Sequence, residues 1–155
     1  MSAYEKFIVR FWPEAVAVGA RSGLHPYALF AIAGKESSGG VSHAARTRNN
    51  FFGLGGGKLT FSTPTACIQY FGNLMARKYA AGIEVSGNPP AFAAWFIDRS
   101  PYLGADATAA QRQQYKRDIP VLWHTAERIA RKYGLSLVPP ALLAQVPPLN
   151  RLKHG

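Results

Sequence analysis

Apolar residues recur at helical spacing along most of the chain, and the densest run lies between Pro26 and Gly40, in PYALFAIAGKESSGG. The positions at i, i+3, i+4 and i+7 of this run are Leu29, Ile32, Ala33 and Glu36. That spacing places all four on one face of a helix. Proline suits the first helical turn and paired glycines suit the positions after the last, so the pattern predicts a helix whose apolar stripe ends at a carboxylate.

Glu36 therefore has an unusual predicted environment for a charged side chain. Partial burial and the negative end of the helix dipole both disfavour the carboxylate, so we expect its pKa to be raised. A general acid needs this property, because it must hold a proton at the pH at which it works. The same spacing also fits a glutamate that extends from the edge of the stripe into water.

Further helices are predicted on both sides of this run by helical periodicity and helix-start residues. They cover residues 2–11, 13–22, 63–79, a segment that begins at Asn88, and 109–118 with a continuation after Pro120 to residue 134. Pro13 is expected to kink or restart the first helix, because proline removes a backbone donor. The chain is thus predicted to be mainly α, with about six short helices around one core.

Residues 41–62 lack helical periodicity and contain the glycine-rich run GLGGGK. This composition predicts an irregular lobe, with a hairpin of residues 51–54 and 58–61 as the regular alternative. The run lacks the Gly-x-x-x-x-Gly-Lys-Ser/Thr spacing of a phosphate-binding loop. A nucleotide site is therefore not predicted here.

The formal net charge of +10 over 155 residues predicts a polyanionic partner. Nucleic acid, an anionic membrane surface and an acidic cell-wall polymer all fit that charge. Basic residues are spread along the chain without a groove-reading motif, which makes nucleic acid the weaker choice. No stretch approaches the roughly 18 apolar residues that a membrane span needs, so membrane insertion is not expected. Cys67 is the only cysteine, so we expect it in the core, with no disulfide, metal or cofactor.

The two ends of the chain differ from its body. Charged residues interrupt the apolar positions of MSAYEKFIVRFWPEAVAVG, so no secretory signal is predicted. Action on a cell wall, in the periplasm or outside the cell, would then need phage lysis, a specialised secretion machine or attachment to a larger protein. Residues 136–155 contain VPPALLAQVPPL, which predicts a polyproline-like strap or a tail without a part in the chemistry.

Four segments, in order, resemble the glucosaminidase-type peptidoglycan hydrolases, a group that includes the flagellar muramidase-like domain and bacterial autolysins within the lysozyme-like superfamily. These segments are AIAGKESSGG, RTRNNFFGLG, FSTPTACIQYFGNLM and SPYLGADATAAQRQQYKRDI. The first resembles the family's alanine-rich helix ending in the catalytic glutamate, and the second its Asn-Asn-Leu-Phe-Gly signature. The resemblance covers about residues 7–135 and implies a lysozyme-like (α+β) catalytic domain over residues 1–135, followed by the Pro-rich segment.

The resemblance also implies roles for individual residues. Glu36 would be the general acid that protonates the leaving glycosidic oxygen, and Tyr102 would be the tyrosine near the scissile sugar. The implied substrate-binding residues are Asn50, Phe52, Gly53, Trp95 and Tyr115. The position of Trp95 on an apolar helix face favours a core residue over a sugar platform, and Tyr115 fits packing at the edge of the site.

One departure from the family concerns the second carboxylate that glycoside hydrolysis usually needs. Residues 37–83 contain no Asp or Glu. Asp98 and Asp106, near Tyr102, are the remote candidates for activating water. The alternative is attack by the substrate's own N-acetyl group, which is favoured because it needs only Glu36 and an orienting hydroxyl or amide.

The sequence thus leads to the hypothesis of a bacteriolytic endo-β-N-acetylglucosaminidase acting on peptidoglycan glycan strands. A lytic transglycosylase or muramidase using the same glutamate is the nearest alternative. A cell-wall-binding module without catalysis is the alternative from a different class. An immunity protein is a further partner compatible with a secreted bacteriolytic enzyme.

Overall fold

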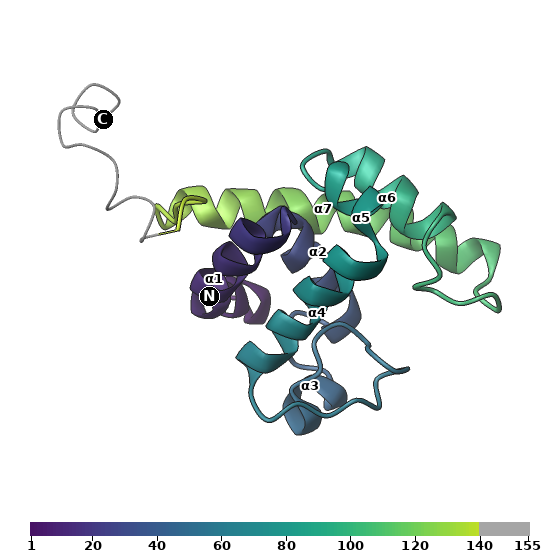
Figure 1. The fold of residues 1–155 in the computed structure, drawn as a ribbon, viewed down its shortest axis with the longest axis horizontal. Coiled ribbons are helices and arrows are strands. Elements are labelled where there is room, and N and C mark those ends of the chain that lie inside the picture. Colours follow the sequence, from purple (N-terminus) through teal and green to yellow (C-terminus); the bar gives the residue numbers. More distant parts are fainter. Residues whose placement is uncertain (140–155) are drawn as a thin grey trace.

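The computed structural model describes residues 1–139, which form seven helices (Figure 1). The helices are α1 (Ala3–Ser22), α2 (Pro26–Ser37), α3 (His43–Arg48), α4 (Pro64–Lys78), α5 (Ala80–Glu84), α6 (Pro89–Asp98) and α7 (Ala109–Lys132). Helix accounts for 66% of these residues, which confirms the mainly α prediction. Residues 1–139 contain no strand, so the hairpin predicted as an alternative for residues 51–54 and 58–61 is wrong.

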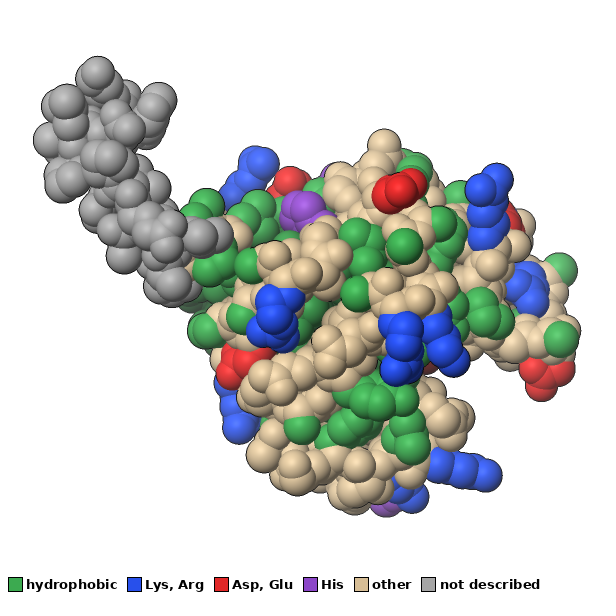
Figure 2. All heavy atoms as spheres, viewed as in Figure 1, with side chains coloured by type: hydrophobic (Ala, Val, Ile, Leu, Met, Phe, Trp, Pro, Cys, Tyr) green, Lys and Arg blue, Asp and Glu red, His purple; other side chains and the backbone are tan. Residues whose placement is uncertain are grey.

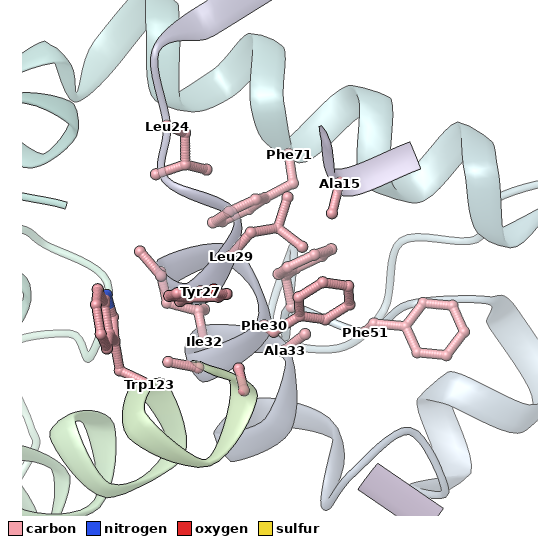
Figure 3. Packing of buried hydrophobic residues seen from close by; sticks show 14 of the residues in the cluster. Ala15, Leu24, Tyr27, Leu29, Phe30, Ile32, Ala33, Phe51, Phe71 and Trp123 are labelled. Carbon is pink, nitrogen blue, oxygen red and sulfur yellow. The ribbon is translucent and has the colours of Figure 1, made fainter. Parts of the chain in front are cut away.

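Helix α2 lies at the centre of the core. Every residue from Pro26 through Gly34 is buried. Figure 3 shows residues of α2 between Phe71 of α4 and Trp123 of α7, and the Tyr27 ring of α2 packs on Trp123 with centroids 5.0 Å apart. A helix that is apolar all round is buried on all sides, so the single stripe predicted from the sequence was too narrow. The polar face of α2 begins only at its last turn.

Helix α1 packs closely on α2 because Gly34 leaves room for Tyr4. A Cβ atom at Gly34 would lie 2.6 Å from the Tyr4 ring, inside van der Waals contact. The Tyr4 hydroxyl lies 3.0 Å from the carbonyl oxygen of Phe30 and 3.1 Å from that of Leu122, and these two acceptors share its single proton. This one side chain therefore ties α1 to both α2 and α7, and fixes the base from which α2 projects its last turn.

Two helices continue through an internal proline. Pro13 lies inside α1 and Pro120 lies inside α7. The predicted restart at Pro13 is therefore wrong. Phe11 and Trp12 before the proline and Ala15 after it are all buried, and their packing outweighs the roughly 3 kcal/mol that an internal proline costs.

The short helices α3 and α5 were not predicted. Helix α3 has six residues, too few to show a period, although Ser42 caps it by accepting a hydrogen bond from the Ala45 amide at 3.2 Å. It lies within residues 41–62, here called the lobe. Figure 1 shows α3 and the lobe on the side of the molecule away from α5 and α6.

The beginning of the Pro-rich segment lies against α1. The Trp12 indole donates a hydrogen bond to the carbonyl oxygen of Ser136 at 2.8 Å. Most of the predicted strap at residues 136–155 lies outside the described residues. Cys67 is buried in the core, as expected. Within residues 1–139, no helix combines the length and apolar character needed to cross a membrane.

Candidate active site

Glu36 lies in the last turn of α2, partly exposed, where the chain enters the lobe. Burial raises the pKa of Glu36 from 4.5 to about 7, against the lowering effects of the Tyr115 hydroxyl and the charge of Lys35. The direction agrees with the expectation from the sequence. A carboxyl group with this pKa holds a proton on a large fraction of molecules at neutral pH, as a general acid must.

Ser38 ends α2 in the left-handed conformation, with φ of 53°. Its amide donates a hydrogen bond back to the Gly34 carbonyl oxygen, and Gly39 and Gly40 continue with positive φ. The helix thus ends beside the two glycines, as predicted, but the left-handed conformation begins one residue earlier, at Ser38. This sharp exit leaves Glu36 at the boundary between the helical core and the lobe.

Asn50 organises the part of the lobe that approaches Glu36. Its side-chain amide donates to the carbonyl oxygens of Leu54 at 2.9 Å and Leu59 at 3.1 Å, and its Oδ1 accepts from the Leu54 amide at 3.1 Å. Only 1% of Asn50 is exposed. Its assignment as a glycan contact is therefore not supported, because its polar groups are used within the lobe. Asn50 shapes the wall of the site without facing it.

Gly53 brings the lobe backbone against the candidate acid. Its φ is +65°, and a Cβ atom there would lie 3.1 Å from Oε2 of Glu36. The neighbouring Phe52 is fully buried and stacks on Phe71, with ring centroids 4.0 Å apart. The assignment of Phe52 as a substrate contact is corrected accordingly: its side chain anchors the lobe in the core, while Gly53 faces the site.

Tyr102 connects the loop between α6 and α7 to the lobe. Its hydroxyl donates a hydrogen bond to the carbonyl oxygen of Phe52, and its ring lies 4.8 Å from the ring of Phe96. Burial raises the pKa of Tyr102 well above its usual value, with the charge of Glu36 as a smaller cause. The hydroxyl is thus used in holding the lobe, which makes Tyr102 a positioning residue.

Tyr115 of α7 is the tyrosine that reaches the candidate acid. Its hydroxyl lies close enough to the Glu36 carboxyl group to stabilise the carboxylate and lower the pKa of Glu36. Lys35 lies with Nζ 4.8 Å from the centre of the Tyr115 ring, and its ammonium is paired with Asp118 at 2.5 Å. The nearest cation in sequence to Glu36 is therefore held by another carboxylate, which leaves burial as the dominant influence on Glu36.

Lys35 and Asp118 are components of this site that sequence reasoning missed. The charge of Lys35 next to Glu36 was visible in the sequence. Its partner lies 83 positions further along, and no local pattern joins the two. Only the packing of α7 along α2 brings them together.

The two remote carboxylates differ in their surroundings. Asp98 pairs with Lys116 at 2.9 Å on an exposed face. Asp106 lines a cavity of about 390 Å³ together with Tyr115, Gln111 and Leu103. Asp106 therefore lines the same cavity as Tyr115, the residue whose hydroxyl lowers the pKa of Glu36.

Trp95 is a core residue. It is 8% exposed, and a Cβ atom added to Gly82 of α5 would lie 2.4 Å from its ring. Its rings pack against Tyr79 and Phe92, with centroid separations of 5.9 and 5.8 Å. The suggestion of a sugar-stacking role for Trp95 is therefore not supported.

Residues 1–139 contain no group of three or more His, Cys, Asp or Glu side chains that could hold a metal ion. Comparisons with protein-family models, with curated proteins and with solved structures found no significant match to this chain. The elements of the site are one partly buried acid, a tyrosine hydroxyl that lowers the pKa of that acid, and a lobe backbone packed against it.

Proposed function

We propose that this chain cleaves the β-1,4-linked glycan backbone of peptidoglycan, with Glu36 as the general acid. The observation that supports this most directly is the Glu36 carboxyl group. It is partly exposed, and burial raises its pKa to about 7. It lies at the exit of a buried helix, against the Gly53 backbone of the lobe. An acid between a helical body and a lobe is the arrangement of the lysozyme-like fold that the sequence resembles, and that fold is part of the proposal.

In the proposed reaction the Glu36 proton passes to the glycosidic oxygen as the bond to the sugar C1 breaks. Positive charge then develops on the ring, and a nucleophile must approach C1 from the other side. The substrate's N-acetyl oxygen supplies that nucleophile and forms a cyclic intermediate, which water opens while Glu36 takes back a proton. This route needs no second carboxylate close to Glu36, in keeping with a lobe that contains no acidic residue.

The specific activity we propose is that of an endo-β-N-acetylglucosaminidase. The substrate fits the net charge of +10, because peptidoglycan carries acidic stem peptides and attached anionic polymers. The chain would act on wall material in the periplasm or outside the cell.

A lytic transglycosylase is the second candidate, favoured by the same lone acid. In that reaction the muramyl 6-hydroxyl attacks C1 in place of the N-acetyl group, and no water enters. Mass spectrometry of purified sacculi digested with the protein separates the two activities. The proposal predicts fragments with reducing-end N-acetylglucosamine. Anhydro-muramyl ends would establish the transglycosylase, and the absence of soluble fragments would favour a binding module.

Tyr115→Phe should shift the pH profile of cleavage toward the alkaline side. The Tyr115 hydroxyl stabilises the charged form of Glu36, so its removal raises the pKa of the acid above about 7. The ring and its stacking on Phe96, at 6.3 Å between centroids, would remain. The measurement is the rate of release of soluble glycan between pH 5 and 9.

Tyr70→Phe is the matched control, because Tyr70 is an exposed tyrosine of α4. It should leave the profile unchanged. If the alkaline limb of the pH profile stays in place in Tyr115→Phe, or moves to lower pH, then the Tyr115 hydroxyl does not lower the pKa of the catalytic acid.

A further inference from the structure

A second concave surface lies between α1 and α3. The cavity measures about 580 Å³, within the range of ligand sites, and Glu36 does not line it. Phe7, Phe11 and Phe51 line its apolar part, and their ring centroids lie 5.0 to 5.9 Å apart. The exposed side chain of Val41 extends the apolar lining.

Three cations from two helices line the same cavity. Lys6 and Arg10 come from α1 and Arg46 comes from α3, and all three are exposed. The guanidinium of Arg10 lies 4.9 Å from the centre of the Phe11 ring. The ion pairs found among residues 1–139 involve none of these three cations, and no acidic residue lines the cavity.

This combination defines the chemistry of an occupant. The apolar lining can bind an aromatic or aliphatic side chain. The cations around it can pair with carboxylates of residues that flank that side chain in sequence. Nucleic acid would use the cations, but its bases stack on exposed aromatic rings, and Phe7, Phe11 and Phe51 are each only 5–6% exposed. A neutral apolar ligand would leave three like charges without partners.

The geometry points to a docking site for an acidic protein segment, which places an apolar side chain against the exposed surface of Phe7 and Phe51 and its carboxylates on Lys6, Arg10 and Arg46. Phe51 lines this cavity, and Gly53, two residues further along, lies against Glu36. The Cα atoms of these two residues are at most about 7 Å apart, so the docking site and the acid lie on neighbouring parts of the lobe. The docking site is nonetheless separate from the acid, and its test does not depend on glycan cleavage.

The test uses fluorescence anisotropy of the full chain with labelled peptides. The probe is Asp-Glu-Leu-Phe-Glu-Asp, compared with Asp-Glu-Ser-Ser-Glu-Asp and Asn-Gln-Leu-Phe-Gln-Asn. We expect the first peptide to bind at least about tenfold more tightly than either of the others, because only it satisfies both the apolar lining and the cations. Binding should weaken as salt screens the charges.

Arg10→Glu/Arg46→Glu should weaken binding of the first peptide by at least about tenfold. Lys58→Glu/Arg128→Glu carries the same change in net charge at exposed cations that do not line the cavity, and should change it less than about twofold. Circular dichroism verifies that both variants are folded. Equal weakening in the two variants would overturn the site, since the attraction would then be to net charge alone. Absence of binding at millimolar peptide, or equal binding of the serine or neutral peptide, would overturn it as well.

Discussion

Glu36→Gln should reduce the rate of glycan cleavage by about a thousandfold, within the range expected for loss of a general acid. Glutamine has nearly the same shape and can occupy the same place beside Gly53, but it has no proton to give to the leaving oxygen. The measurement is the rate of soluble fragment release from purified sacculi near pH 6, where most Glu36 is protonated because burial raises its pKa to about 7.

Glu84→Gln is the matched control for this loss. Glu84 is an exposed glutamate at the end of α5, and the same chemical change there should leave the rate within about twofold. A Glu36→Gln protein that cleaves as fast as the parent would remove Glu36 from the mechanism. If neither parent nor variant cleaves but both bind sacculi, the chain is a wall-binding module.

The second large effect concerns stability: Glu36→Gln, which should lower activity, should raise stability at alkaline pH. Burial raises the pKa of Glu36 from 4.5 to about 7, so the folded protein binds a proton that the unfolded chain releases between these values. Stability from this group is fully present below pH 4.5 and is lost as the pH rises through 7. The free energy of unfolding should therefore be lower at pH 8 than at pH 4, by about 3 kcal/mol from Glu36 alone.

Glu36→Gln isolates that contribution, because glutamine does not titrate. The free energy of unfolding of the variant minus that of the parent should increase by about 3 kcal/mol from pH 4 to pH 8. The measurement is urea denaturation of both proteins at each pH. Glu84→Gln should show no such trend. A constant difference between Glu36→Gln and the parent would mean that Glu36 titrates alike in the folded and unfolded protein. Loss of activity with gain of stability above pH 7 is the expected trade for a partly buried ionisable group at a functional site.

The helical body was largely predictable because local signals agree with the packing. Asn88 caps α6 by accepting a hydrogen bond from the Ala91 amide at 3.1 Å, and Thr63 caps α4 in the same way through Ala66. Periodicity failed where the context outweighed it. Residues 26–34 are apolar all round because α2 is enclosed, and Pro13 lies in a continuous helix because both sides of it are buried.

The site was predictable only in part, because its chemistry depends on contacts between distant segments. The end of an apolar helix indicated Glu36, and its raised pKa follows from burial. The sequence did not indicate that Asn50 would use its amide inside the lobe. It also did not show that Tyr115, rather than Tyr102, would reach the acid, since both tyrosines fit the same motif and only the path of the backbone distinguishes them.

The central claim is that the fold holds a proton on Glu36 near neutral pH. The most direct measurement is a ¹³C NMR titration of the glutamate side-chain carboxyl carbons, with the Glu36 signal assigned by its absence in Glu36→Gln. We expect a midpoint at about 7. A midpoint near the ordinary glutamate value of 4.5 would contradict it, because the side chain would then be a carboxylate at neutral pH with no proton to donate.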